Sequence, residues 1–506
     1  MDTQHLHSPD VSFDGGDLDC GSGLLLLIRR HIDPLAAGQT LEILSTDSTV
    51  EVDLPAWCRM TGNDLLSLER RTGGQNSYLV RKGATVERQA RAAAEAPRTS
   101  ATVGSPIAQT DAPVEAAPIR PLSVMGMGSW PRPSWMLRAM HDRMAGRMPD
   151  DEFQATADDA VRQSVDAQLR AGVDVLTDGE QRRDSYASFV GGILENCQLI
   201  PLTDLLPYVS DPQKFEKELR ALDIPAHEVR HPAVFGRIAR TRPLALHELK
   251  YVQTIADKPV KIALPGPYLL TRTMWMECLS DRAYASREVL AEDIVRILRE
   301  ELADLLHAGV VLVQFDEPVL SEVVFARQKE GGGRSFMCGA LGEKKPIAEE
   351  LAFARDLINA VVAGFPRERT AMHVCRGNWS PDESVALAGD YRALLPFFKQ
   401  LDVGTFMLEL ATPRAGEIEV LRELPDDRRI GVGVVNQKLK TIESVDEVLS
   451  RAETAVALFG AERVLLNPDC GFATFADNPL ASSQIAEGKL RSIVAASARL
   501  RDKYGV

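Results

Sequence analysis

The feature that most constrains the fold is a regular alternation, over residues 120–506, of short β-prone apolar runs with amphipathic segments. The amphipathic segments, such as 286–309 and 443–461, place apolar residues three and four positions apart, which is the spacing of one helix face. Eight β-prone runs recur between them, at 122–128, 173–179, 260–267, 310–318, 370–377, 403–411, 430–437 and 463–471.

Eight strands that alternate with helices predict a (β/α)8 barrel, the TIM-barrel architecture. The long stretch between the second and third runs predicts an insertion at residues 187–257. A doubly wound open sheet is the alternative. The first run is not followed by a Gly-x-Gly-x-x-Gly turn, which argues against the nucleotide-binding form of that sheet.

A smaller module precedes the barrel. Residues 11–83 are expected to form strand, helix, strand, helix, strand and strand, a small α/β sandwich. Residues 84–119 are rich in Ala, Pro, Thr and Ser and show no sustained apolar period, which predicts a flexible linker. The predicted domains are therefore 11–83, the linker 84–119 and the barrel 120–506.

Composition excludes several classes of partner. The chain has 506 residues and a formal net charge of −14, so no excess of basic residues is available for nucleic acid or an anionic membrane. The first residues lack the pattern of a secretory signal, and the apolar run at 24–28 is too short to span a bilayer. Seven scattered cysteines do not suggest a disulfide framework. We expect a reduced, cytoplasmic protein.

Polar residues gather at the ends of the predicted strands. In a (β/α)8 barrel the chemistry takes place where the strands run into loops at the C-terminal mouth. The candidates at those ends are Ser129, Asp178, Glu180, Asp316, Glu317, His373, Cys375, Glu409, Lys438, Asp469 and Cys470.

Four of these residues form a candidate metal site. The two-residue side-chain period of a strand places His373 and Cys375 on one face, and a closed barrel would bring Glu409 and Cys470 close to them. One imidazole, two thiolates and one carboxylate suit Zn2+. Structural zinc sites usually take ligands as tight pairs, whereas three strand ends contribute here, which indicates a site built for chemistry.

Simpler explanations exist for single residues. A lone Cys in an apolar strand is usually a small core residue, and a lone His is more often hydrogen-bonded structure than a ligand. The combination His-x-Cys with a further Cys and Glu favours a metal. Asp178 and Glu317 are equally well explained as helix-capping carboxylates, and packing or loop positions are expected for Cys58, Cys197, Cys278 and Cys338.

The barrel region resembles the catalytic barrel of the cobalamin-independent methionine synthase family in its short form. The motifs that carry the resemblance are GSWPRP (128–133), DGEQRRDS (178–185), QFDEP (314–318), HVC (373–375), LELATPR (408–414) and NPDCG (467–471). The resemblance implies transfer of a methyl group to the zinc-activated thiol of homocysteine, which yields methionine. It assigns zinc to His373, Cys375, Glu409 and Cys470, and the substrate's carboxylate and amino groups to Ser129, Glu180 and Asp316.

The chemistry of such a site is consistent with thiol alkylation. Zinc coordination removes the thiol proton, and the negatively charged ligands preserve the nucleophilicity of the sulfur. An ion with four protein ligands has no vacancy, so the substrate must displace one or expand the shell. Glu409 is our candidate for the ligand that yields.

The methyl donor stays open. Full-length family members have a second, N-terminal barrel that helps to hold polyglutamylated folate, and this sequence has the small module instead. The family's proton-donating His after strand seven is matched by Lys438, the candidate proton donor here. The sequence therefore leaves three donors open: a methyltetrahydrofolate, a corrinoid protein or a different alkyl donor.

The small module resembles the TusA/SirA-type sulfur carriers. The order of its elements, the strand motif AGQTLEI (37–43) and the helix motif DLPAWC (53–58) carry the resemblance, which implies a persulfide on Cys20. Cys20 lies at the N-terminus of the first predicted helix, whose partial positive charge lowers the pKa of a thiol. The family's Cys-Pro-x-Pro is Cys20-Gly-Ser-Gly in this chain.

Two enzymatic hypotheses follow. The first is a zinc-dependent methyltransferase that acts on homocysteine. The alternative is a thiol alkyltransferase or sulfur-transfer enzyme with a non-folate donor, fed by a persulfide on Cys20 from a cysteine desulfurase or another sulfur-relay partner. A non-enzymatic adaptor with a residual zinc is disfavoured because the set of substrate-side residues is complete.

Overall fold

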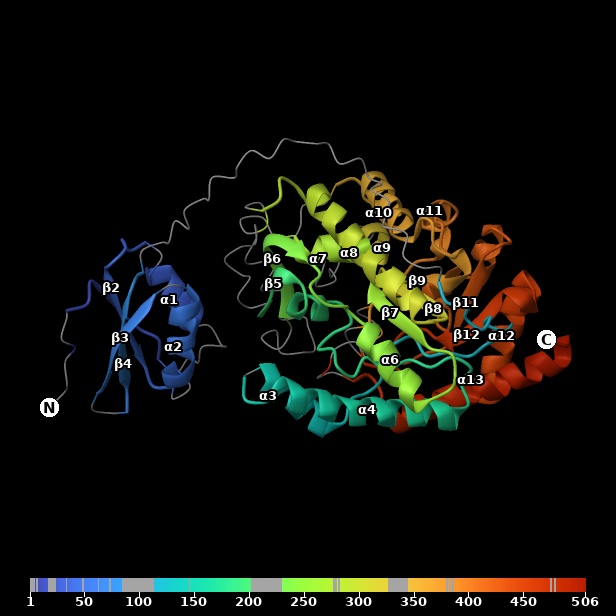
Figure 1. Cartoon of the computed structure of the whole chain (residues 1–506), viewed down its shortest axis with the longest axis horizontal. Coiled ribbons are helices and arrows are strands. Elements are labelled where there is room, and N and C mark those ends of the chain that lie inside the picture. The colour runs from blue at the N-terminus through green and yellow to red at the C-terminus, as the bar shows by residue number, and fades with distance from the viewer. Residues whose placement is uncertain are drawn as a thin grey trace. The chain divides into compact units, whose positions relative to one another are not determined.

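The computed structural model describes residue 5 and residues 8–16, 24–83, 113–201, 230–275, 280, 283–325 and 345–506. Short gaps remain at 33, 48–49, 62, 72–73, 145, 379–380, 382, 384–385, 474–475 and 477–478. The chain divides into two compact units, Met1–Ser105 and Pro106–Val506 (Figure 1). Residues 84–112 of the predicted linker lie outside the described residues.

The first unit is a small α/β sandwich with the predicted element order. It consists of β1 (Val11–Asp14), α1 (Leu25–Ile32), β2 (Thr40–Ser45), α2 (Val50–Thr61), β3 (Asp64–Arg70) and β4 (Asn76–Arg81). The sheet order is β1-β2-β4-β3, with β1 parallel to β2 and the other pairs antiparallel. Residues of α1 and α2 pack on the sheet's apolar face, and the core includes Cys58, as expected for a packing thiol.

The second unit is the predicted barrel. Six parallel strands form a sheet in the order β12-β11-β10-β9-β8-β7. Their bounds are β7 (Lys261–Pro265), β8 (Leu312–Asp316), β9 (Thr370–Val374), β10 (Thr405–Leu408), β11 (Arg429–Val435) and β12 (Val464–Pro468). Parallel bridges between Val124 and Leu466, Met125 and Val175, and Leu176 and Val260 close the sheet into a ring. The first two predicted strands are therefore present as short bridged segments.

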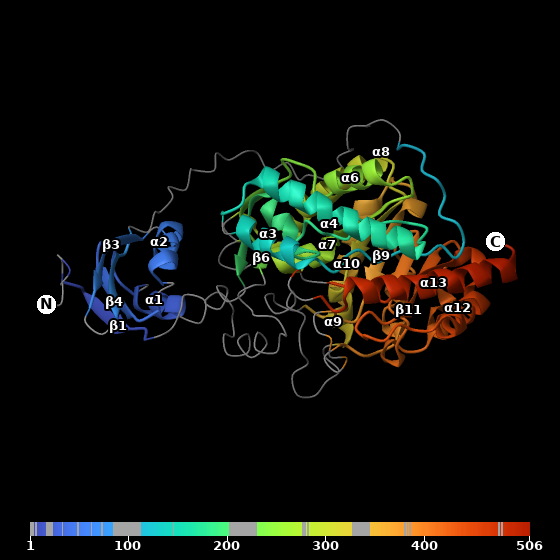
Figure 2. The same cartoon turned by 90° about the horizontal axis from the view of Figure 1, so that it is seen from below.

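Helices surround this ring of strands. Those with eight or more residues are α3 (Ser134–Met144), α4 (Asp150–Ala171), α6 (Leu246–Ile255), α7 (Pro267–Met274), α8 (Arg287–His307), α10 (Ile347–Val362), α12 (Val445–Phe459) and α13 (Ser483–Tyr504). Helices α4 and α13 run side by side along the outside in both views (Figures 1 and 2). No helix among the described residues combines the length and apolarity needed to cross a membrane.

The predicted insertion between the second and third strands forms an antiparallel hairpin. Strands β5 (Glu195–Pro201) and β6 (Arg230–Ala239) pair with each other, and α6 follows them. Residues 202–229 between the two strands lie outside the described residues. Cys197 is buried in β5, as expected for a packing thiol, while Cys278 and Cys338 lie outside the described residues.

The barrel interior changes from apolar to polar along its axis. Met125, Val175, Leu312, Met407 and Leu465 belong to an apolar cluster of its own. The candidate site residues follow these positions along the same strands. The apolar layer fills one end of the barrel and leaves the carboxyl ends of the strands free for chemistry.

The charged residues of α8 are not all exposed to solvent. Glu301 is fully buried, and its carboxylate accepts hydrogen bonds from the backbone N–H groups of Leu244, Ala245 and Leu246 at the start of α6. Arg240 pairs with the same carboxylate. A buried carboxylate that caps a neighbouring helix has no signature in the helix's own periodicity.

His231 makes the stability of the barrel unit dependent on pH. Its ring is buried, and burial lowers its pKa to about 3. Between these pKa values the histidine is protonated in the unfolded chain and neutral in the folded one. Stability therefore falls as the pH drops below the pKa of the unfolded chain's histidine, about 6.5. We expect the free energy of unfolding to lose about 1.4 kcal/mol more between pH 7.5 and 5.5 in the native chain than in His231→Gln.

The measurement is urea unfolding of both proteins at the two pH values. His141→Gln, at an exposed position on α3, is the matched control and should behave like the native chain. An equal pH dependence in His231→Gln and the native chain would contradict the assignment.

Candidate functional site

Three of the four predicted metal ligands meet at the carboxyl end of the barrel. One ligand atom from each of His373, Cys375 and Cys470 lies within 4.8 Å of the others. His373 lies in β9, Cys375 directly follows it, and Cys470 follows β12. His373 and Cys375 are buried, and Cys470 is partly exposed.

The hydrogen bonds of His373 fit a ligand. Its Nδ1 lies 3.1 Å from the carbonyl oxygen of Met407, and its Nε2 lies 3.5 Å from the sulfur of Cys470. A metal-binding histidine commonly donates one ring N–H to a backbone carbonyl, which fixes the ring and leaves the other nitrogen for the ion.

The two thiols differ in acidity. A hydrogen bond from Cys470 lowers the pKa of Cys375 well below its usual value, against the effect of burial, and His373 adds to the lowering. The same hydrogen bond and burial raise the pKa of Cys470. Two cysteine sulfurs of different acidity thus lie beside an imidazole, a donor set suited to a borderline-soft ion such as zinc.

Glu409 lies next to this cluster but does not join it. It directly follows β10 and is fully buried. One carboxylate oxygen accepts a hydrogen bond of 2.8 Å from the backbone N–H of Arg376, and the other pairs with the Arg414 guanidinium. Both oxygens of this candidate ligand are therefore held by other groups.

Lys438 lies in the same electrostatic environment. Burial and the charge of Arg414 lower its pKa, while Glu409, Cys375 and Cys470 raise it. Its ammonium nitrogen is buried and has no hydrogen-bond partner within the described part of the chain. Lys438 is thus a cation beside the cluster that is free to bond to a ligand.

The predicted substrate carboxylates face the same interior. Asp316 ends β8 and pairs in register with His373 on β9. Burial raises the pKa of Glu180 to about 7, with Arg183 opposing and Asp316 adding to the rise. Glu180 has a φ of 54°, in the left-handed region, and its Oε2 is buried without a hydrogen-bond partner among the described residues. A non-glycine residue held in this conformation at a candidate site indicates a positional requirement.

Ser129 lies at the end of the first bridged segment. Its hydroxyl oxygen accepts a hydrogen bond of 3.3 Å from the backbone N–H of Ala473, and its carbonyl accepts one from Phe472. A Cβ on Gly471 would lie 2.2 Å from the hydroxyl. This glycine allows the loop after β12 to approach Ser129.

The two carboxylates with an alternative explanation have local roles. Both oxygens of Glu317 accept hydrogen bonds of 2.8 Å, from the backbone N–H groups of Tyr268 and Leu269 at the start of α7. Glu317 is therefore a helix-capping carboxylate. Asp178 accepts a hydrogen bond from the backbone N–H of Glu180 and so supports that turn.

Several residues of the site were not selected from the sequence. They are Arg183, Arg414, Lys261 and Gln314, all buried or nearly so. Arg183, Arg414 and Gln314 contact Glu180, Glu409 and Asp316 in that order, and Lys261 hydrogen-bonds to Gln314. Lys261 had a signal that could have been used: it is a lysine within an otherwise apolar strand. Arg183 and Arg414 lie within the quoted motifs but looked like ordinary surface charges.

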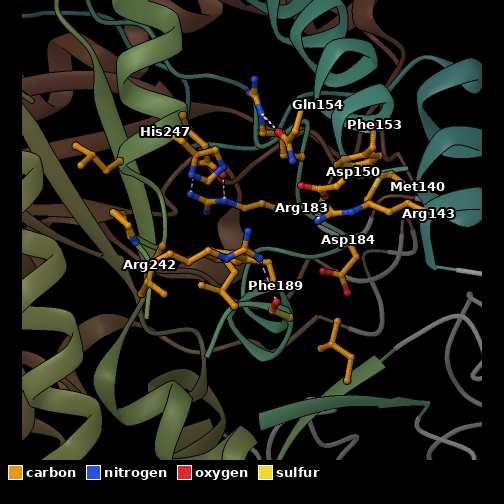
Figure 3. A pocket seen from close by; sticks show the side chains of 18 of the residues that line it. Met140, Arg143, Asp150, Phe153, Gln154, Arg183, Asp184, Phe189, Arg242 and His247 are labelled. Atoms are coloured by element: carbon orange, nitrogen blue, oxygen red, sulfur yellow. Dashed lines mark hydrogen bonds and ion pairs between the residues drawn. The ribbon is translucent and has the colours of Figure 1, made fainter. Parts of the chain in front are cut away.

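A pocket of about 640 Å³ adjoins the loop that carries Glu180. It is lined by residues of α3, α4, the 182–184 loop and the insertion, and Arg183 and Phe189 both line it (Figure 3). The guanidinium of Arg183 lies 4.2 Å from the centre of the Phe189 ring, pairs with Glu248 and approaches Glu180 to 3.9 Å. Arg183 therefore joins the pocket to the candidate substrate site.

The fold and the site define a (β/α)8-barrel enzyme with a His/Cys cluster at the strand ends. Residues 122–203, 219–334 and 372–497 match the profile of the cobalamin-independent synthase catalytic domain. The chain belongs to this family, and the expected class, a methyltransferase, is confirmed with it. Residues 23–82 match the sulfurtransferase TusA profile.

Individual relatives agree with this family. A methionine synthase from Saccharolobus solfataricus is 26% identical over 387 residues, which cover 76% of this chain and 96% of the relative. One from Sulfurisphaera tokodaii is 27% identical, with 77% and 95% covered. The solved B12-independent methionine synthase from Shewanella sp. W3-18-1, in complex with selenomethionine, shares the fold with a TM-score of 0.57 and 22% identity, over 76% of this chain and 98% of that chain.

Cys20 lies outside the described residues, and the TusA match begins at residue 23. The profile match confirms that the small module resembles the TusA family, but it does not include Cys20. The predicted persulfide on Cys20 stays a prediction.

Gly128 should be essential for the position of Glu180. A Cβ at Gly128 would lie 2.2 Å from Glu180 Oε1, so Gly128→Ala must displace this carboxylate. Because small misplacements of binding groups strongly affect catalysis, we expect methyltransferase activity to fall by about 100-fold, without loss of folding by circular dichroism.

Gly126→Ala is the matched control, because a Cβ there meets no atom within 4 Å. Equal activities in the two variants would show that the position of Glu180 does not matter.

Proposed function

We propose that the chain is a zinc-dependent methyltransferase of the cobalamin-independent methionine synthase type that methylates the thiol of homocysteine. The observation that carries the proposal is the convergence of His373, Cys375 and Cys470 at the barrel mouth of a member of this family. The curated relatives named as methionine synthases support the same reaction.

The residues fit a zinc ion by their chemistry. His373, Cys375 and Cys470 would hold it, with Glu409 as the fourth ligand when its carboxylate is released by Arg376 and Arg414. Zinc, when bound, lowers the pKa of a coordinated thiol and so makes a thiolate available at neutral pH. Because Glu409 has alternative partners inside the protein, it is the ligand best suited to yield to an incoming thiol.

The surrounding residues would orient the amino acid. Glu180 and Asp316 would accept hydrogen bonds from the substrate ammonium, and the unpaired Oε2 of Glu180 offers an acceptor for it. Ser129 would donate its hydroxyl hydrogen to the substrate carboxylate. Charge-assisted hydrogen bonds of this kind are stronger than neutral ones, so they fix the thiol-bearing side chain relative to the cluster.

With a methyltetrahydrofolate donor, Lys438 would supply the proton to the nitrogen of the departing folate. Its ammonium lies within the electrostatic influence of the cluster and is not engaged by described residues. The donor is a methyltetrahydrofolate or a methylated corrinoid protein.

Incubation of the zinc-loaded protein with homocysteine tests the reaction. We expect methionine, measured by mass spectrometry, to form with methyltetrahydrofolate or with methylcobalamin. With methyltetrahydrofolate, Lys438→Met should slow turnover by at least about tenfold, as for loss of a general acid. Methionine from neither donor would contradict the proposed function.

Metal analysis tests the ligands separately. Cys375→Ser and Cys470→Ser should each lose most of the bound zinc because a serine hydroxyl is a poor zinc ligand. Zinc per chain is measured by inductively coupled plasma mass spectrometry. Cys197→Ser, which changes another buried cysteine of the same unit, is the control and should keep its zinc; full zinc content in the first two variants would refute the site.

A second candidate function is favoured by the TusA match over residues 23–82. In this hypothesis Cys20 carries a persulfide received from a cysteine desulfurase, and the barrel uses that sulfur with a non-folate donor. Intact mass after desulfurase treatment should then rise by one sulfur atom in the native chain and not in Cys20→Ala. No mass increase in the native chain would exclude this function.

A further inference from the structure

Lys261 places a buried ammonium group inside the barrel. It is the first residue of β7, and its side chain is fully buried. The ammonium donates hydrogen bonds to the carbonyl oxygen of Met127 at 3.0 Å and to Gln314 Oε1 at 2.6 Å. None of the roles described above uses this residue.

Gln314 connects this ammonium to a candidate substrate ligand. Its Oε1 accepts from Lys261, and its Nε2 donates to Asp316 Oδ1 at 2.7 Å and to the Met127 carbonyl at 3.1 Å. The lysine can only donate and the carboxylate can only accept, so the orientation of the amide is fixed. A continuous chain of hydrogen bonds thus determines where the Asp316 carboxylate points.

Lys261 also interacts with the second carboxylate. Burial lowers the pKa of Lys261 to about 7, and the charges of Asp316 and Glu180 oppose that lowering. Two arginines also lie near Glu180: Arg183 pairs with Glu248 at 2.5 Å, and Arg132 donates hydrogen bonds to the backbone carbonyls of Glu180 and Arg183. Lys261 is therefore a cation that interacts with both Asp316 and Glu180.

A purely structural role explains this arrangement poorly. A buried charge is expensive to desolvate, and a methionine would fill the same volume without that cost. Two carboxylates close together in a buried site cannot both stay ionised without a cation. A lysine near them favours their ionised forms while leaving oxygens such as Glu180 Oε2 for a ligand.

We propose that Lys261 is a positioning residue for the amino group of the substrate. Through Gln314 it fixes the direction of the Asp316 carboxylate, and its positive charge opposes the repulsion between Asp316 and Glu180, so that both acids can face one substrate ammonium. Lys261 therefore contributes to the preference of the site for a thiol that carries an α-amino group. This inference rests on the proposed function and adds a residue that positions its substrate.

The test compares two ligands that differ only in the amino group, methionine and 4-(methylthio)butanoate, by calorimetry on the zinc-loaded full chain. The native protein should bind methionine more tightly than 4-(methylthio)butanoate. Lys261→Met should weaken methionine binding by about tenfold or more, the scale of a lost charged hydrogen bond, and change the affinity for the amine-free ligand by less than about twofold. Gln314→Leu should give the same pattern in weaker form.

Lys258→Met removes a partly exposed lysine just before β7 and is the charge control. Two outcomes overturn the inference and leave the proposed function intact. In the first, Lys261→Met and Gln314→Leu lose the same affinity for both ligands. In the second, neither variant loses affinity for methionine. Equal affinity of the native protein for the two ligands also overturns it. Failure of the native protein to bind either methionine or homocysteine overturns the proposed function, and the inference with it.

Steady-state kinetics with homocysteine add a second readout. A positioning role predicts a raised KM in Lys261→Met with kcat changed by less than about threefold, because the amino group contributes binding in both ground and transition states. A fall in kcat with an unchanged KM contradicts that role.

Discussion

The closure of the barrel is the constraint on which the site depends. In the sheet order, β9 and β12 are separated by β10 and β11, which in a flat sheet would put their ends about 14 Å apart. The bridges at Val124, Met125 and Leu176 curl the sheet into a ring. Side chains that point inward from these strands then converge, and His373 and Cys375 meet Cys470.

The converging groups are mostly charged, and because they are buried, each must be held in a fixed direction by a partner. Glu409 is held by Arg376 and Arg414, and Asp316 by Gln314. In a low-dielectric interior an unpaired charge is costly, so each acid has a partner that both stabilises it and fixes its direction. Glu180 Oε2 and the Lys438 ammonium are among the buried polar atoms without a hydrogen-bond partner in the described part of the chain, and both would face a ligand in the proposed reaction.

Local sequence predicted the positions of the strands well and the contacts of the long side chains poorly. All eight β-prone runs coincide with strands or bridged segments. His373 and Cys375 were placed on one face by a period of two, which is a property of the backbone. The partners of Glu409 depend on Arg414, whose flexible side chain has several possible directions in any sequence-based view. Glu301 likewise reaches a neighbouring helix rather than solvent.

The sequence by itself determined the alternation of strands and helices, the two-unit organisation and the donor atoms available at each strand end, because these follow from periodicity and residue chemistry. Only the tertiary structure decided which donors meet, that Glu409 lies beside the His/Cys cluster, and that Lys261 lies beneath two acids. Those outcomes depend on ring closure and on the direction of buried side chains. Both are set by contacts between residues that are distant in the chain.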